Sequence, residues 1–173
     1  MARTLVPTGA FVHILIEDHG RYVLVQEAKP ELGCPWCYPA GGMEPGESIV
    51  EAVVREALEE TGLVVEPRYL MRIWHRIPQE QDRRSPSPEL WVYVVVASVR
   101  GGELKTAADE HSLQARWFRP DELEHLNLRW PEVRELIEMH QQGAPLLPID
   151  AYVAHSETTH GTIGPGRAGE EPS

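Results

Sequence analysis

The 173-residue sequence contains few cysteines, few basic residues and no long apolar run. Two cysteines, Cys34 and Cys37, are too few for a disulfide scaffold in a chain of this length. No stretch approaches the roughly 18 consecutive apolar residues of a membrane-spanning helix. Residues 1–9 also lack the charged segment and long apolar run of a secretory signal. We therefore expect a cytoplasmic protein with no membrane partner.

The charge balance is acidic, with 16 Lys and Arg against 27 Asp and Glu and a formal net charge of −11. Such a chain has no general attraction for the phosphate backbone of nucleic acids or for anionic membrane surfaces. We therefore expect no nucleic-acid polymer as a partner. Apolar residues make up 42% of the chain, which suits one globular domain with a core of ordinary size.

Apolar runs separated by turn-forming residues predict a mixed α/β domain. Two runs at residues 10–17 and 22–26 flank Asp18-His19-Gly20 and predict a β-hairpin. Further strands are expected at residues 69–77, 90–99 and 114–118, and helices at residues 49–61, 120–126 and 131–142. Gly101-Gly102 predicts a turn, and the polar stretch from Pro78 to Pro88 is typical of a functional or mobile loop.

The predicted helix at residues 49–61 has clear start and stop signals. Ser48 is a favourable N-cap, Glu51 completes a capping box three residues later, and Gly62 stands where the helix should end. On a helical wheel one side is expected to face the core, and it carries Val50, Val53, Val54, Ala57, Leu58 and Thr61. Three neighbouring carboxylates lie on the opposite side or at its boundary: Glu56, Glu59 and Glu60.

Carboxylates at this spacing repel one another by roughly a few tenths of a kcal/mol per pair in an isolated helix. Two interpretations remain: a solvated acidic face, or a site for hard divalent cations such as Mg²⁺, which prefer carboxylate and phosphate oxygens. The segment at residues 39–47 (PAGGMEPGE) favours the cation, because it supplies glycines for a sharp turn and carbonyls near the helix. Glu47 is expected to pair with Arg55 and to fix this loop to the helix.

Residues 41–63 (GGMEPGESIVEAVVREALEETGL) resemble a complete Nudix box. The matching positions are Gly41, Glu47, Arg55, Glu56, Glu59, Glu60, Gly62 and Leu63. Ala57 stands where a larger aliphatic residue is usual, a mild departure because alanine still packs on an apolar side. A pattern with this many specified positions is far more specific than a lone glycine motif. The sequence is similar to Nudix hydrolases over about residues 10–142.

The resemblance implies a Nudix fold, in which a mixed β-sheet is sandwiched between helices (α/β/α), over residues 10–150. Residues 1–9 would be an N-terminal extension. Residues 151–173 would be a disordered tail, because from His155 onward they are rich in Gly, Ser, Thr and Pro. The resemblance is also compatible with a homodimer.

The resemblance further implies a hydrolase of phosphorus-containing anhydrides that uses Mg²⁺ or Mn²⁺. The metal would be held by the carboxylates of Glu56, Glu59 and Glu60 and the backbone carbonyl of Ala40. Glu47 and Arg55 would form a structural ion pair. The general base would be Glu56 or a downstream acid, because the base varies within the family. Asp109 or Glu110 is the expected downstream acid, with Glu110 as a further metal ligand.

The substrate would be a nucleotide. Several stretches are similar to Nudix diphosphatases that act on oxidised guanine nucleoside diphosphates, namely residues 26–29, 36, 39–54, 101–106 and 112–115. The Pro-Ala-Gly loop is also similar to a bacterial branch that acts on nucleoside di- and triphosphates. Pro78, fifteen residues after Leu63, keeps ADP-ribose as the alternative substrate. An alternative of another class is a non-catalytic nucleotide-sensing module, but such modules typically lack box carboxylates that this chain retains.

Tryptophan and cysteine residues supply the remaining candidates. Trp36, in the loop before the box, and Trp74, on the strand after it, are the preferred residues for stacking on a nucleobase. Trp91 and Trp117 lie inside predicted strands and are expected in the core. The CxxC segment at residues 34–37 has neither a following helix nor further ligands, so two loop thiols are expected rather than a redox or zinc site.

Overall fold

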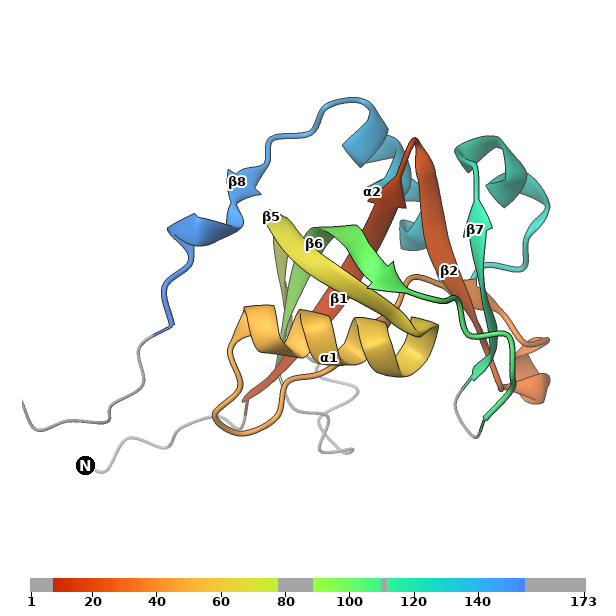
Figure 1. Ribbon diagram of the computed structural model, residues 1–173, viewed down its shortest axis with the longest axis horizontal. Helices are drawn as coiled ribbons and strands as arrows, with labels where there is room; N and C mark the ends of the chain where they lie inside the picture. The colour runs from red at the N-terminus through yellow and green to blue at the C-terminus, as the bar shows by residue number, and fades with distance from the viewer. Residues whose placement is uncertain (1–7, 78–88, 110–111, 155–173) are drawn as a thin grey trace, which may run out of the picture.

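A computed structural model describes residues 8–77, 89–109 and 112–154 (Figure 1). The strands are β1 (Thr8–Asp18), β2 (Arg21–Glu27), β3 (Trp36–Cys37), β4 (Ala40–Gly42), β5 (Leu63–Arg76), β6 (Glu89–Gly102), β7 (Ser112–Phe118) and β8 (Leu147–Pro148). The α-helices are α1 (Ile49–Thr61) and α2 (Glu132–Gln141). Short 3-10 helices lie at η1 (Pro30–Leu32), η3 (Pro120–His125) and η4 (Ile149–Ala151).

The strands form one mixed sheet, as predicted. Its main order is β3-β2-β1-β6-β5-β8, with β4 paired to β1 and β7 paired to β2. In the described part of the chain, β1 and β6 run parallel from Thr8 opposite Glu89 to Glu17 opposite Ser98, and the other paired strands are antiparallel. The mixed sheet therefore joins the N-terminal hairpin to the long β5–β6 pair.

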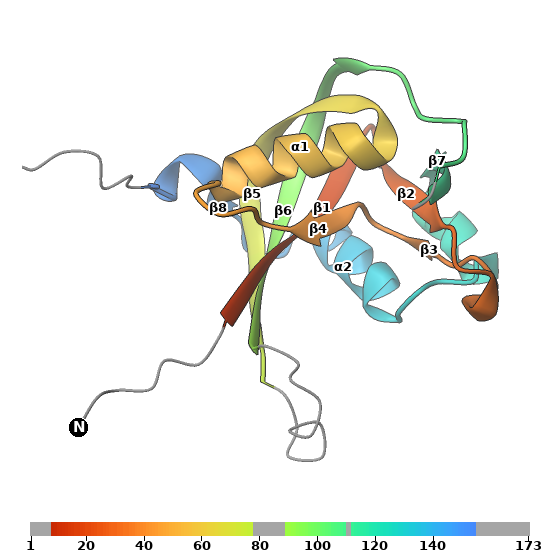
Figure 2. The same cartoon turned by 90° about the horizontal axis from the view of Figure 1, so that it is seen from below.

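The predicted hairpin at β1 and β2 is present, but its strands separate soon after the turn. His19 and Gly20 have positive φ angles of 49° and 74°, and the ladder is formed at Glu17 opposite Tyr22 and Asp18 opposite Arg21. Residues 36–42 then cross from one strand to the other, since β3 pairs with β2 and β4 pairs with β1 (Figure 2). This divergence opens the sheet beside the N-terminal half of β1.

The two α-helices cover opposite faces of the sheet (Figure 2). On one face, α1 packs through Ile49, Ala52, Val53 and Ala57 against apolar residues of β1, β2, β5, β6 and β7. On the other face, α2 packs through Val133, Leu136 and Ile137 against a second apolar cluster. This arrangement confirms the predicted α/β/α sandwich.

Helix α1 has the predicted bounds, and Val53, Ala57 and Thr61 are buried as the wheel predicts, but Leu58 and Glu56 differ from it. Ser48 accepts a hydrogen bond from the Glu51 amide, Glu51 bonds back to the Ser48 amide, and Gly62 adopts a left-handed conformation at the C-terminus. The wheel placed Leu58 inside and Glu56 outside, whereas Leu58 is 50% exposed and Glu56 only 9% exposed. The reason is that residues 40–42 pack on one flank of the helix and cover Glu56.

The two longest strands extend beyond their predicted limits. Strand β5 begins at Leu63 rather than at residue 69, and β6 continues through Gly102, so the predicted Gly101-Gly102 turn is part of a ladder. Register shifts near Val64, Pro67 and Leu70 let this ladder continue past a proline. The predicted helix at residues 120–126 is the 3-10 helix η3.

Packing near the chain ends differs from the predicted boundaries. Strand β1 begins at Thr8, within the predicted N-terminal extension. Tyr152 packs against the core, and its hydroxyl accepts a hydrogen bond from the Ile49 amide at 3.4 Å. Most of the predicted disordered tail, and the predicted loop at residues 78–88, lie outside the described residues.

None of the helices in the described part of the chain is long and apolar enough to cross a membrane. The cytoplasmic location and the homodimer stay predictions.

Candidate active site

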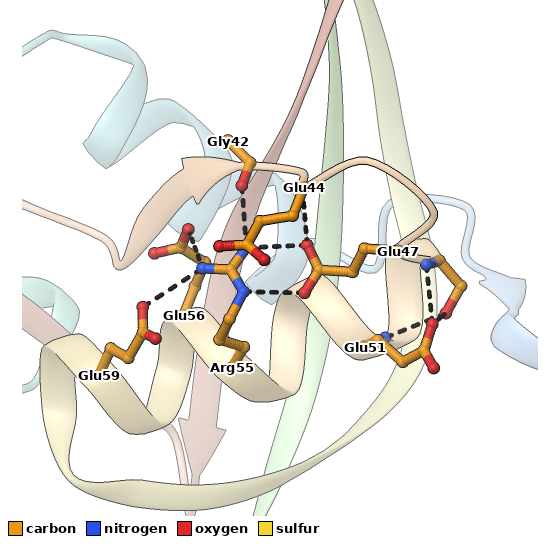
Figure 3. Close-up of polar contacts among 8 residues, drawn as sticks. Gly42, Glu44, Glu47, Glu51, Arg55, Glu56 and Glu59 are labelled. Atoms are coloured by element: carbon orange, nitrogen blue, oxygen red, sulfur yellow. Dashed lines mark hydrogen bonds and ion pairs between the residues drawn. The ribbon is translucent and has the colours of Figure 1, made fainter.

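Arg55 connects the loop before α1 to the helix (Figure 3). Its Nε donates to Glu47 Oε1 at 2.8 Å and its Nη2 donates to Glu47 Oε2 at 2.8 Å. Nη2 also donates to the carbonyl oxygen of Gly42 at 2.9 Å. A planar guanidinium bonded at two carboxylate oxygens and one carbonyl holds its partners in a fixed geometry. The expected contact between Glu47 and Arg55 therefore ties residues 42–47 to the second turn of the helix.

Glu47 and Arg55 both carry a charge in this pair. The hydrogen bonds from Arg55 hold the pKa of the Glu47 carboxyl below its usual value, and burial opposes this only in part. The same bonds raise the pKa of Arg55. Glu47 accepts a further hydrogen bond from the Glu44 amide at 2.9 Å, so the loop is also closed on itself. The pair is positioned to orient the loop rather than to exchange protons.

Glu56 lies between Arg55 and the glycine loop. Its Oε1 accepts a hydrogen bond from Arg55 Nη1 at 2.7 Å. A Cβ atom added to Gly41 would lie 1.9 Å from Glu56 Oε1 and 2.3 Å from Oε2, far inside van der Waals contact. A side chain at position 41 would therefore displace the Glu56 carboxylate from this place.

Glu59 and Glu60 have different surroundings although they are neighbours in sequence. Glu59 is exposed, and its Oε2 lies 3.2 Å from Arg55 Nη1. Glu60 turns inward, and its Oε2 accepts a hydrogen bond from the Ala40 amide at 2.9 Å. Burial raises the pKa of Glu60 to about 7; the Ala40 bond opposes this, and the charges of Glu56 and Glu27 add to it. The contact found at Ala40 thus involves its N–H, whereas the prediction concerned its carbonyl.

The carboxylates of α1 have the chemistry of a divalent-cation site. Oxygen donors of this kind suit Mg²⁺ and Mn²⁺. The crowding of Glu56 and Glu27 around a buried Glu60 would be relieved by a bound cation. Within the described residues, however, no three Asp, Glu, His or Cys side chains converge on one point, because Arg55 holds Glu56 and Glu59 while Ala40 holds Glu60.

A cavity of about 770 Å³ adjoins these carboxylates. Its charged lining, the charged or carboxylate end, consists of Glu56, Glu59, Glu60, Glu27, Lys29, Lys105 and Asp109. Its ring-bearing lining, the aromatic end, consists of Phe11, His13 and Trp130. The cavity lies where β1 and β2 diverge, with Val25 and Cys37 on one side and Ala40 on the other. Its lining therefore combines charged side chains with aromatic rings.

The charged end holds two cation–carboxylate groups besides those of α1. Lys105 donates to the Glu59 carbonyl oxygen at 3.1 Å and pairs with Asp109, which also accepts from the Ser112 amide. Glu27 binds Lys29 Nζ at 2.6 Å and faces Arg129 Nε at 3.1 Å. Asp109, one of the two acids predicted downstream, thus lines the cavity. The other, Glu110, lies outside the described residues.

The aromatic end is built around His13. Its ring centroid lies 4.7 Å from that of Tyr38, 5.6 Å from that of Trp74 and 6.4 Å from that of Trp130, with the last pair nearly parallel. Burial lowers the pKa of His13 to about 4, so its imidazole is neutral at neutral pH. The segment that carries Trp130 is fixed to β3, because Trp36 N donates to Asn127 O and Arg129 N donates to Trp36 O.

The tryptophans occupy different places from those expected. Trp36, a predicted base contact, is 7% exposed and packs edge-on against Phe118 in the core. Trp74 packs against His13 but does not line the cavity. Trp91 was expected in the core, which is wrong, since it is 39% exposed and stacks on His75 at the surface. Trp117 is partly buried against the core, as expected.

The site residues expected from the sequence did not include His13, Glu27, Lys105 or Trp130, although the fold brings them to the cavity. The clearest available sign was a histidine in an otherwise apolar strand segment, AFVHILI. The cysteines are unpaired in the described structure, and Cys37 is buried at the cavity wall, which raises the pKa of its thiol. Two loop thiols were expected, which holds for Cys34 but is wrong for Cys37, because Cys37 belongs to strand β3.

Known proteins share this arrangement of sequence and fold. A model of the NUDIX domain matches residues 6–139. The 8-oxo-dGDP phosphatase NUDT18 of Homo sapiens is 40% identical over 132 residues, which are 75% of this chain and 37% of that protein. An ADP-ribose pyrophosphatase of Methanocaldococcus jannaschii is 33% identical over 105 residues, which are 61% of this chain and 59% of that protein.

A solved structure of a NUDIX hydrolase from Nitrosomonas europaea superposes with a TM-score of 0.71 at 29% identity, covering 86% of this chain and 97% of that one. The chain spans little more than a third of the length of the human relative. The family model, by contrast, covers well over half of this chain and includes the glycine loop and α1. The chain therefore belongs to the Nudix family.

Proposed function

We propose that this chain is a divalent-metal-dependent hydrolase that cleaves a phosphoanhydride bond of nucleoside di- or triphosphates. The observation that carries the proposal is the cavity of about 770 Å³, whose lining combines carboxylates with aromatic rings. A nucleotide has the same two parts, a polyanionic phosphate chain and a flat aromatic base. The volume also lies within the range of roughly 300–1,000 Å³ that is usual for small-molecule sites.

The proposed metal ligands are the carboxylates of Glu56, Glu59 and Glu60, with the Ala40 carbonyl and Glu110 as further candidates. When bound, Mg²⁺ or Mn²⁺ would neutralise phosphate charge and lower the pKa of a coordinated water. The bidentate contact between Glu47 and Arg55 keeps the glycine loop against the helix, so that Glu56 and Glu60 stay at the cavity wall.

In the proposed reaction a water oxygen forms a bond to phosphorus, the bridging P–O bond breaks, and the leaving phosphate takes its electron pair. Glu56 or Asp109 accepts the proton of the attacking water, since both carboxylates line the cavity. Lys105 places a positive charge at the same wall, fixed by the Glu59 carbonyl and by Asp109. Charge neutralisation and positioning would supply most of the rate enhancement.

Oxidised guanine nucleoside diphosphates are the proposed substrate class. The support is the 40% identity to a protein named 8-oxo-dGDP phosphatase. ADP-ribose is the second candidate, because a relative at 33% identity is named ADP-ribose pyrophosphatase. A nucleotide-sensing module without catalysis receives no support, since Glu56, Glu59 and Glu60 are all present.

Product analysis tests this proposal. Purified protein is incubated with 8-oxo-dGDP, dGDP or ADP-ribose, with and without Mg²⁺, and the products are separated by chromatography. We expect Mg²⁺-dependent release of phosphate from 8-oxo-dGDP, and a loss of about a thousandfold in kcat/KM for Glu60→Gln. The control Glu66→Gln changes a surface carboxylate that pairs with Arg68 and Arg100, and it should keep the wild-type rate.

Two results would contradict the proposal. Equal rates for wild type and Glu60→Gln would show that the box carboxylates are not used. Cleavage of ADP-ribose with guanine nucleotides untouched would keep the metal-dependent chemistry and replace the substrate class.

A further inference from the structure

Arg129 contacts one side chain from each end of the cavity. Its Nε lies 3.1 Å from Oε2 of Glu27, and its guanidinium carbon lies 5.0 Å from the centroid of the Trp130 ring. Glu27 is the last residue of β2 and Arg129 precedes α2, so the contact joins segments that are far apart in the sequence. Glu27 and Trp130 line the cavity, whereas Arg129 does not. Arg129 can therefore act on a ligand through its neighbours rather than by contact.

The contact between Glu27 and Arg129 is buried. The two side chains are 16% and 26% exposed, and Glu27 Oε2 and Arg129 Nε are buried atoms that have no hydrogen bond among the described residues. Each of these atoms depends on the opposite charge of the other. The second oxygen of Glu27 accepts a hydrogen bond from Lys29 Nζ at 2.6 Å. Loss of the Glu27 charge would leave the buried Nε of Arg129 without a counter-charge, so the guanidinium would move toward solvent and away from Trp130.

The backbone alone does not fix the ring of Trp130. Arg129 N donates to Trp36 O at 2.9 Å, which holds the chain one residue before the tryptophan. The ring itself is partly exposed, and its centroid lies 6.4 Å from that of His13 and 6.5 Å from that of Tyr38. The guanidinium of Arg129 is nearer than either, and a cation over a tryptophan ring is attracted by its electron density. Arg129 is therefore the contact best placed to hold this ring.

We propose that Arg129 is a positioning residue for nucleotide binding: Glu27 holds its guanidinium, and the guanidinium holds the Trp130 ring at the place where the nucleobase contacts it. This inference rests on the proposed function. It adds to that function a link between the two ends of the cavity, because a carboxylate of the charged lining fixes a ring of the aromatic lining. The link acts on binding of the base, since neither the guanidinium nor the indole supplies a reacting group.

Fluorine NMR tests the position of the ring without a ligand. The five tryptophans are replaced by fluorotryptophan, and the Trp130 resonance is identified by its loss in Trp130→Phe. Its shift between water and heavy water measures how exposed the ring is. We expect the exposure to rise in Glu27→Gln and Arg129→Met, and to stay near the wild-type value in Arg129→Lys, which keeps a cation beside Glu27. Unchanged exposure in both Glu27→Gln and Arg129→Met would overturn the inference.

Arg21→Met is the matched control for this measurement. Arg21 is likewise paired with a carboxylate, and its guanidinium lies 5.2 Å from the centroid of Trp117, a ring outside the cavity. The substitution should therefore expose Trp117 and leave both the exposure of Trp130 and the KM for 8-oxo-dGDP at their wild-type values.

Steady-state kinetics test the role in binding. We expect Arg129→Met to raise KM for 8-oxo-dGDP about fivefold and to leave kcat nearly unchanged, as loss of a binding contact predicts. Because the effect passes through the ring, Arg129→Met added to Trp130→Ala should raise KM no further than Trp130→Ala alone, whereas independent effects would multiply. Multiplied effects or an unchanged KM would each overturn the inference. If the wild type hydrolyses no nucleotide, the proposed function fails, while the exposure of the Trp130 ring still decides whether Arg129 holds it.

Discussion

The two ends of the cavity are built in opposite ways. The three glutamates of the carboxylate end that lie on α1 come from one continuous segment, residues 39–62, in which the loop and α1 are joined by Arg55. The aromatic end combines β1 with Trp130, which lies more than a hundred residues later in the chain. Charged hydrogen bonds hold the first end, and packed rings hold the second. Local segments can therefore encode a charged site, whereas the whole fold is needed to assemble the ring-lined part.

The largest predicted effect concerns the buried charge at the carboxylate end. The pKa of Glu60 is raised from 4.5 to about 7 in the folded protein. Below pH 4.5 the carboxyl is protonated in both the folded and the unfolded state, so it does not change the free energy of unfolding. Between pH 4.5 and 7 the unfolded chain releases the proton first, so the folded state loses stability as the pH rises, by about 3 kcal/mol at most. Above pH 7 the carboxyl is ionised in both states, so the loss of folding stability no longer changes with pH.

Urea denaturation of the metal-free protein across this pH range measures the effect. We expect Glu60→Gln to be more stable than wild type at pH 8 and equally stable at pH 4, because glutamine keeps the acceptor for Ala40 and carries no charge. Glu59→Gln, at an exposed site on the same helix, should follow the wild-type profile. If wild type and Glu60→Gln respond identically to pH, Glu60 carries no burial penalty. Addition of Mg²⁺ at pH 8 should stabilise the wild type and not Glu60→Gln.

The second prediction concerns a substitution, Gly41→Ala, that moves a carboxylate without removing it. In Gly41→Ala the new Cβ would lie within 2.3 Å of both Glu56 carboxylate oxygens, so the side chain must move. Because the displaced atoms are the end of a flexible side chain, we expect a small loss of stability. We expect kcat/KM to fall about a hundredfold, since misplacement of a catalytic group by about 1 Å costs that much.

Gly101→Ala is the matched control, because a Cβ at that position meets nothing within 4 Å. Hydrolysis rates and thermal midpoints are measured for both variants. A Gly41→Ala variant that retains full activity would show that Glu56 need not lie where the structure has it.

The carboxylate end was predictable because its signals are local. Ser48, Glu51 and Gly62 mark the helix by side-chain and backbone preferences that act within a few residues. The wheel erred at Leu58 and Glu56 because it describes one helix alone and does not include the loop that covers one flank. The start of β5 was missed for a related reason, since Pro67 is accommodated by register shifts that depend on β6.

The aromatic end was not predictable from local preference. Trp36 is buried because β3 pairs with β2 and Phe118 of β7 covers the ring, and these segments are far apart in sequence. Trp130 lines the cavity because the backbone of Asn127 and Arg129 is hydrogen-bonded to Trp36. Local sequence preference predicts only whether each tryptophan lies in a strand or a loop. The pairing of distant strands determines which ring lines the cavity.

The last prediction tests whether the aromatic end binds the base at all. Trp130→Ala removes a ring from the cavity wall, and base–aromatic stacking contributes roughly 1–3 kcal/mol, so we expect about a tenfold rise in KM for 8-oxo-dGDP. The value of kcat should change little, because the indole of Trp130 supplies no acid, base or metal-binding group to the reaction at phosphorus.

Trp91→Ala is the matched control, because Trp91 and Trp130 are 39% and 38% exposed and Trp91 lies outside the cavity. Steady-state kinetics for both variants distinguish the role of the aromatic end from that of the carboxylate end. A rise in KM restricted to Trp130→Ala would show that the ring acts on binding while the carboxylates act on the chemical step. A fall in kcat with KM unchanged would instead place Trp130 with the carboxylates, and the division between the two ends would be wrong.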